Sequence, residues 1–289
     1  SRRAFIRGSA ATVAALLLAR RLAAQAARPA DPHCWALLSD THIAADRAKI
    51  AREINLADRL ATVVREVIAW PQRPAGVLIN GDLSLNSGES ADYATFGELV
   101  RPLREAGMPL HLAMGNHDHR ERFWAALPNE KRVNAPIQDR QLSIVRAPRA
   151  NWFVLDSLDR TLVTPGVLGE IQLAWLARAL DANADKPALV MVHHNPNTGG
   201  IKNGLVETDA FFEILRPRRH VKAYLFGHSH RWSVEQDSSG LHLINLPATS
   251  YPFDKQQPTG WVVANLEPDS VQLEFRALDR RHAAHSREL

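Results

Sequence analysis

Apolar runs and segments with helical periodicity alternate along the first half of the chain. Residues 34–38 are continuous and apolar, which is typical of a buried parallel strand, and the mostly apolar runs 77–80 and 110–114 predict two more strands. Between them, apolar side chains recur at helical spacing over 54–68 and over 93–103. This order of strand, helix, strand, helix and strand predicts right-handed parallel crossovers, and therefore an α/β fold.

In the second half of the chain, predicted strands and helices alternate less regularly. Helices are predicted at 121–127, 171–180 and 211–215. Strands are predicted at 141–145, 152–155, 188–192, 223–226, 232–236, 241–245, 261–265 and 271–275. We expect the first two of these strands to pair antiparallel, the last four to form a meander, and the polar tail after Leu278 to be frayed.

Five of the apolar runs stop at polar side chains that carry oxygen or imidazole donors. These endings are Ser39-Asp40-Thr41-His42, Asn80-Gly81-Asp82, Gly115-Asn116-His117-Asp118, His193-His194 and Gly227-His228-Ser229-His230. In an open α/β sheet, ligands gather where strands end at their carboxyl edge, so the five endings can meet in one crevice. The glycines before Asp82, Asn116 and His228 would allow sharp turns and a close approach to an ion.

Seven donors in these endings would suit a pair of divalent or trivalent metal ions. They are Asp40, His42, Asp82, Asn116, His193, His228 and His230. Carboxylate and imidazole groups bind Fe, Mn, Zn or Ni, and without a sulfur donor the set does not choose among these metals. A carboxylate that bridges two ions about 3.5–4 Å apart gives the geometry of two-metal hydrolysis.

The order of the motifs resembles the signature of the calcineurin-like metallophosphoesterase superfamily. That signature is Asp-x-His, Gly-Asp, Gly-Asn-His-Asp/Glu, His and Gly-His-x-His, and all five elements occur in this order between residues 37 and 230. The resemblance implies two mixed β-sheets packed as a sandwich and flanked by helices. It is nearest to the single-domain cyclic-nucleotide and glycerophosphodiester phosphodiesterases, which implies hydrolysis of a small phosphodiester. A phosphomonoesterase and a non-catalytic metal-bearing binding module of the same fold are the alternatives.

The resemblance also implies a role for each residue. Asp40, His42 and His230 would bind one ion, Asp82 would bridge, and Asn116, His193 and His228 would complete the second site. His194 is the alternative to its neighbour His193. His117 would be oriented by Asp118 and would protonate the leaving oxygen, while a hydroxide held between the ions attacks phosphorus. Segments 195–205 and 250–255 could form substrate walls.

Residues 1–26 have the pattern of a twin-arginine export signal. Arg2 and Arg3 precede the apolar stretch 10–19, and Ala24-Gln25-Ala26 offers a small-x-small cleavage site. The apolar stretch is shorter than the roughly 20 residues of a membrane span, so we expect no stable membrane anchor. We therefore expect contact with the export machinery in transit, a periplasmic location and a single metallophosphoesterase domain over 27–289.

The charge of the chain bears on nucleic-acid binding, and its cysteine content bears on disulfides and zinc sites. The chain has 35 Lys+Arg and 31 Asp+Glu; five Arg and no acid fall in residues 1–26, which leaves 30 against 31. A remainder near neutrality gives no electrostatic argument for a nucleic-acid partner. Cys34 is the only cysteine, which excludes an internal disulfide and a cysteine-based zinc site. The sequence gives no indication of an oligomeric state.

Overall fold

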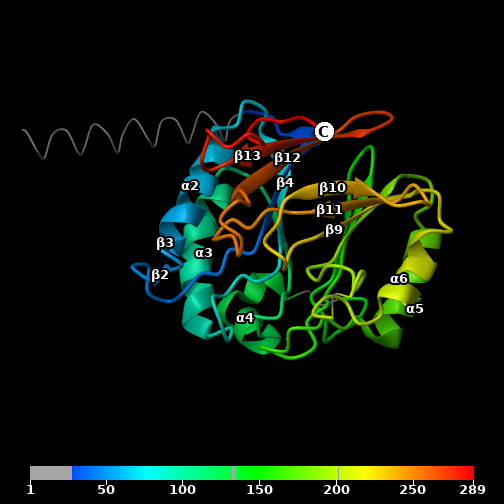
Figure 1. Ribbon diagram of the computed structural model, residues 1–289, viewed down its shortest axis with the longest axis horizontal. Coiled ribbons are helices and arrows are strands. Elements are labelled where there is room, and N and C mark those ends of the chain that lie inside the picture. Colours follow the sequence, from blue (N-terminus) through cyan, green and yellow to red (C-terminus); the bar gives the residue numbers. More distant parts are fainter. Residues whose placement is uncertain (1–27, 132–134, 201) are drawn as a thin grey trace, which may run out of the picture.

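The computed structural model describes residues 28–131, 135–200 and 202–289 (Figure 1). The predicted export signal at residues 1–26 lies outside the described residues. The elements in chain order are β1 (Asp31–Ser39), β2 (Ile50–Ala51), β3 (Ile54–Asn55), α2 (Leu56–Ala69), β4 (Pro74–Asn80), α3 (Ser90–Glu105), β5 (Leu110–Ala113), α4 (Arg120–Ala126), the 3-10 helix η1 (Pro128–Glu130), β6 (Ser143–Arg146), β7 (Asn151–Val154), α5 (Gly169–Asp181), β8 (Ala188–Met191), α6 (Thr208–Leu215), β9 (Val221–Phe226), β10 (Ser233–Gln236), β11 (His242–Asn245), β12 (Gly260–Leu266) and β13 (Val271–Ala277). In this part of the chain, no helix combines the length and apolar character that crossing a membrane requires.

Two mixed β-sheets form the centre of the protein, as predicted. One sheet has the strand order β13-β12-β1-β4-β5, and the other has the order β10-β11-β9-β8-β7-β6. Strands β1, β4 and β5 run parallel, and so do β7, β8 and β9 in the second sheet. Helices α2, α3 and α4 lie on one side of the sandwich and α5 and α6 on the other (Figure 1). The predicted sandwich flanked by helices is confirmed.

Strand β1 shows how the sequence builds these layers. Successive side chains of a strand point to opposite faces of its sheet. Cys34, Ala36 and Leu38 accordingly pack in the apolar cluster that joins the first sheet to α2 and α3. Trp35 and Leu37 lie in a second cluster, together with side chains of the other sheet. The run is therefore apolar throughout because both of its faces are buried.

The carboxyl ends of parallel strands from both sheets meet at one edge of the sandwich. The side-chain amide of Asn80, at the end of β4, donates to the carbonyl of Val192 after β8 over 3.2 Å. The N–H of Gly227, after β9, donates to the carbonyl of His193 over 2.9 Å. These bonds place the polar endings of the two sheets next to each other, which confirms the predicted convergence.

The C-terminal strands differ from the predicted meander. Strands β10 and β11 form a hairpin in the six-stranded sheet, where β11 pairs in parallel with β9. Strands β12 and β13 pair with each other in the five-stranded sheet instead. The prediction was wrong because apolar alternation identifies a strand but carries no information about its partner.

The prediction of a frayed tail was also wrong. The backbone groups of Leu289 and Leu273 exchange hydrogen bonds of 2.9 and 3.0 Å, and Glu288 bridges Glu274 in antiparallel register. The last residues therefore lie along β13. Their polar composition suits an edge position that faces water, and composition alone does not distinguish such an edge from a disordered tail.

A short hairpin precedes α2 and was not predicted. Strands β2 and β3 pair antiparallel, with Ile50 opposite Asn55 and Ala51 opposite Ile54. The helix then begins at Leu56, because the Asn55 side chain accepts a hydrogen bond of 2.9 Å from the N–H of Asp58 and so caps the first turn.

Candidate metal centre

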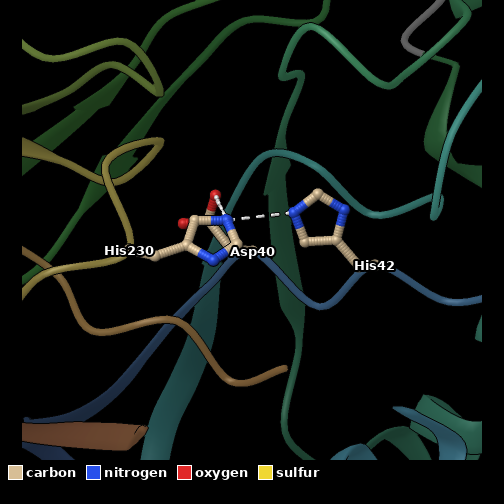
Figure 2. A group of neighbouring side chains, drawn as sticks. All are labelled: Asp40, His42 and His230. Carbon is tan, nitrogen blue, oxygen red and sulfur yellow. Dashed lines mark hydrogen bonds and ion pairs between the residues drawn. The ribbon is translucent and has the colours of Figure 1, made fainter. Parts of the chain in front are cut away.

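Asp40, His42 and His230 bring their side chains together at the end of β1 (Figure 2). The Nε2 of His230 lies 3.3 Å from Oδ1 of Asp40 and 3.1 Å from Nε2 of His42. All three residues are buried, and their ligand atoms lie within 4.8 Å of one another. Their backbones all have positive φ, between 47° and 52°, which turns the chain sharply just where the side chains converge.

Asp82, His193 and His228 form a second group with the same spacing. The Nε2 of His193 lies 3.3 Å from Oδ2 of Asp82 and 4.0 Å from Oδ1 of Asp40. The Nε2 of His42 is 3.6 Å from the same Oδ2 of Asp82, so this carboxylate lies between the two groups.

Backbone carbonyls fix the orientation of three of the imidazole rings. Nδ1 of His193 contacts the carbonyl of Asn80 at 2.7 Å, and Nδ1 of His42 contacts that of Leu85 at 3.3 Å. Nδ1 of His230 contacts the carbonyl of Tyr251. Since a carbonyl only accepts, Nδ1 of each ring carries a proton, and Nε2 is the atom that faces the carboxylates. Histidines that bind metals in proteins are usually held in this way.

The buried polar atoms of the cluster fit metal ions. Among the described residues, the side-chain oxygen of Asn116 is buried without a hydrogen-bond partner, and Nε2 of His193 is buried and faces the carboxylate oxygens of Asp82 and Asp40 at 3.3 and 4.0 Å. A buried polar atom without a partner is costly, and a cation would satisfy both atoms. The His and Asp groups are compatible with a dinuclear metal site.

The protonation equilibria show that the two carboxylates attract positive charge to the cluster. Burial alone would raise the pKa of Asp40, but attraction to His230 and His193 outweighs it and lowers the pKa to about 2. Burial opposes a charge on His193, yet the carboxylates of Asp82 and Asp40 raise its pKa to about 10. Burial lowers the pKa of His42 to about 4 and that of His228 to about 4, which keeps both imidazoles in the neutral form that binds metals. The carboxylates thus draw positive charge into a buried site.

His194, the alternative to His193, lies outside the three metal-binding groups found among the described residues. Its Nδ1 is 2.7 Å from the hydroxyl of Ser157, and its ring packs at 4.7 Å from that of His228. Burial, and then the neighbouring His228, hold the pKa of His194 well below its usual value. The geometry therefore favours His193 as the residue that faces the carboxylates.

Glycines allow the backbone to approach the two carboxylates closely. A Cβ atom on Gly115 would lie 2.2 Å from Oδ1 of Asp82, and one on Gly227 would lie 2.5 Å from Oδ2 of Asp40. Gly81 has a φ of +74°, a conformation that other residues rarely adopt. The close packing at these glycines and the sharp turn at Gly81 are confirmed, and the approach to an ion stays a prediction.

His117 faces the same site from the loop after β5. It forms a third close group with His42 and Asp82, and its backbone N–H donates to Oδ1 of Asp82 over 2.9 Å. Its Nδ1 contacts the backbone carbonyl of Asn86 at 2.9 Å. The Asn86 carbonyl was not predicted as the partner of His117, because every residue has a backbone carbonyl and the sequence does not distinguish one from another.

Asp118 does not orient His117, so that part of the prediction was wrong. Its buried carboxylate accepts hydrogen bonds from the N–H of Gly115 over 2.9 Å and from the hydroxyl of Tyr93 over 3.1 Å. It also accepts from the N–H groups of Leu83 and Ser84, each over 3.2 Å. Burial, with the nearby charge of Asp82, raises the pKa of Asp118 to about 7. Neighbouring side chains of this tight loop point in different directions, so Asp118 ties the loop to the protein interior while His117 faces the cavity.

Residues 36–232 match the family model described as calcineurin-like phosphoesterase. The chain belongs to the calcineurin-like phosphoesterase family. It is a metal-dependent phosphoester hydrolase, and the prediction of that class is confirmed. A probable cyclic nucleotide phosphodiesterase of Rhodopseudomonas palustris is 32% identical over 82% of this chain and 89% of that protein. A 3′,5′-cyclic adenosine monophosphate phosphodiesterase of Pseudomonas aeruginosa is 30% identical over 75% of this chain and 76% of that protein.

Solved structures agree on the fold. A dimetal phosphatase from Danio rerio superposes with a TM-score of 0.64 over 86% of this chain and 97% of that chain. The two sequences are 18% identical, and the superposition shows that the two proteins share a fold.

The cavity of this phosphoesterase has a volume of about 610 Å³, enough for a small phosphoester. Six of the predicted site residues line it: His42, Asp82, Asn116, His117, His228 and His230. Both segments predicted as substrate walls contribute, through Asn195 and Asn203 and through Phe253 and Asp254. Thr164 also lines the cavity, although its loop carries no recognisable motif.

Proposed function

We propose that the protein is a phosphodiesterase that hydrolyses 3′,5′-cyclic nucleotides with two bound metal ions. The observation that carries this proposal is the meeting of two ligand groups, one at Asp40 and one at Asp82, in a cavity that His117 also lines. The relatives named as cyclic nucleotide phosphodiesterases, which match most of the chain, support this substrate class.

The distances support one assignment of the ligands. The first ion would be held by Asp40, His42 and His230, and the second by Asn116, His193 and His228. Asp82 would bridge the two, since its Oδ2 lies 3.6 Å from His42 and 3.3 Å from His193. Oxygen and imidazole donors suit Fe, Mn or Zn.

Different residues of the chain then have different roles in the hydrolysis. When bound, the two ions supply positive charge to the phosphoryl oxygens and activate water. His117 keeps one proton on Nδ1, which faces the carbonyl of Asn86 at 2.9 Å, so a second proton would be held on Nε2 and pass from there to the departing ester oxygen. The N–H of His117 holds Asp82 in place at the same time. Water adds to phosphorus, one ring ester bond breaks, and the product is a nucleoside monophosphate.

The test compares several esters after metal analysis. The purified protein is loaded with Mn, Fe or Zn, and hydrolysis of cyclic AMP, cyclic GMP, glycerophosphocholine, bis-p-nitrophenyl phosphate and p-nitrophenyl phosphate is followed. We expect hydrolysis of the cyclic nucleotides, and faster release of nitrophenol from the diester than from the monoester. Faster hydrolysis of the monoester would identify the protein as a phosphomonoesterase. If the metal-loaded protein hydrolysed none of the esters, it would be identified as a binding module.

We also propose that residues 1–26 direct export to the periplasm through the twin-arginine route, ahead of a single domain over 27–289. The paired Arg2 and Arg3 before an apolar stretch support this proposal. Fractionation of cells that express the chain should find it in the periplasm, and replacement of both arginines by lysine should retain it in the cytoplasm. Export of the double-lysine variant at the original level would refute the route.

A further inference from the structure

The rim of the metal cavity carries an aromatic ring that faces water. Phe253 lines the cavity and is 53% exposed, whereas most large apolar side chains of the described residues are buried. One part of the ring stacks on His230, with centroids 4.1 Å apart and an interplanar angle of 18°. The exposed part is thus held in position by a residue of the metal-ligand group.

A guanidinium group lies beside this ring. Cζ of Arg52 is 5.1 Å from the ring centre of Phe253 and 5.3 Å from that of Tyr251. Among the described residues, Arg52 has no hydrogen bond or ion pair, so its five N–H donors are available. Its neighbour Glu53 approaches Lys255 at 3.7 Å, across to the segment that carries Phe253.

The backbone around Arg52 has an unusual conformation. Arg52 and Glu53 form the two-residue loop between β2 and β3, and their φ angles are 47° and 68°. Hairpin loops with two positive φ angles usually contain Asn and Gly, because other side chains are strained there. Strain of this kind persists mainly at sites of function. Here it holds a cationic, planar group over an exposed ring at the mouth of the cavity.

We infer that Phe253 and Arg52 form the platform that binds the nucleobase of the substrate. This inference rests on the proposed hydrolysis of cyclic nucleotides. A nucleobase is flat, with apolar faces that stack on aromatic and guanidinium groups and an edge that carries hydrogen-bond acceptors. The His230, Phe253 and Arg52 side chains run from the ligand group to the rim, so a nucleotide whose phosphate lies at Asp40 and Asp82 can reach the platform with its base.

The test isolates the base from the rest of the ligand. AMP and ribose 5-phosphate share the phosphate and the sugar and differ by the base, and each is measured as a competitive inhibitor of bis-p-nitrophenyl phosphate hydrolysis. We expect AMP to inhibit the unaltered protein at least ten times more tightly. Phe253→Ala and Arg52→Ala should each reduce this ratio at least threefold, and Phe253→Tyr, which retains the ring, should keep it.

Controls separate the platform from damage to the metal centre. The ratio is taken within each variant, so a change in turnover that affects both inhibitors cancels. Because Phe253 touches His230, the metal content of each variant is measured too. If Phe253→Ala loses metal, Phe253→Leu and Arg52→Ala are compared instead, and the ratio should fall in these variants. Ile171→Ala is the matched surface control, since Ile171 is 73% exposed on α5, and it should keep the ratio.

Two results would overturn the inference: a ratio near one in the unaltered protein, or an unchanged ratio in both Phe253→Leu and Arg52→Ala. Either result combined with hydrolysis of cyclic nucleotides would leave the proposed function standing. A large ratio that these variants reduce, without hydrolysis of cyclic nucleotides, would support the platform and refute the proposed substrate.

Discussion

A single methyl group at Gly115 tests whether close backbone approach positions the Asp82 carboxylate. In Gly115→Ala the new Cβ would lie 2.2 Å from Oδ1 of Asp82, 2.5 Å from the backbone nitrogen of Asp82 and 2.7 Å from Nε2 of His193, whereas ordinary contact begins near 3.4 Å. The φ of Gly115 is not in the left-handed region, so alanine is acceptable to the backbone itself. The carboxylate and the backbone of Asp82 must therefore move by about 1 Å, and a misplacement of that size costs on the order of 100-fold in rate. Overpacking should also destabilise the fold by about 1–3 kcal/mol.

The assay measures metal content by mass spectrometry, turnover of bis-p-nitrophenyl phosphate, and the melting temperature. We expect lower metal content and a turnover reduced by about 100-fold. Gly97→Ala is the matched control: it lies in α3, its Cβ would meet the flexible end of Leu127 at 2.7 Å, and it should leave turnover unchanged. Gly115→Ala protein with the original metal content and turnover would refute the argument that this glycine makes room for Asp82.

Three further predictions concern other parts of the chain. His117→Ala should lower turnover by about 100-fold or more with metal content retained, as loss of a general acid does; undiminished turnover would remove His117 from the mechanism. Arg120→Ala should destabilise the protein by about 3–5 kcal/mol in urea denaturation. The variant removes two N–H donors, at 2.6 and 2.8 Å, from the fully buried carboxylate of Asp156. A loss of stability below about 1 kcal/mol, the value of a surface ion pair, would contradict this. Burial, and then the charge of Asp31, raise the pKa of the Cys34 thiol to about 12, so it stays protonated at pH 8 and iodoacetamide should label it only after unfolding; rapid labelling of the native protein would show that the first strand is open to solvent.

The candidate site was predictable because its signals are local. His193 follows an apolar run directly, Asp40 and Asp82 come within three residues of the end of one, and parallel strands bring such endings to one edge without further information. The adjacent pair His193 and His194 shows where local signals stop. Both side chains are imidazoles, and only their contacts differ. Nδ1 of His193 contacts the carbonyl of Asn80, whereas Nδ1 of His194 contacts the hydroxyl of Ser157.

Contacts between distant segments were not predictable for a related reason. Arg52 and Phe253 belong to separate loops, and their approach depends on how a two-residue turn and the loop before β12 are placed by the sandwich. Asp118 was assigned to His117 because the two are neighbours in sequence, but its oxygens bind backbone groups that the fold places around it.

The amino-acid sequence by itself determined the α/β alternation, the buried strands and the set of oxygen and imidazole donors that the fold brings together, because periodicity and strand endings are properties of short stretches of chain. Only the tertiary structure decided which sheet each C-terminal strand joins, which ring faces the carboxylates, and which side chains stand at the rim of the cavity. Strand pairing and hydrogen bonds to backbone carbonyls depend on the packing of the whole chain, and no residue type encodes them.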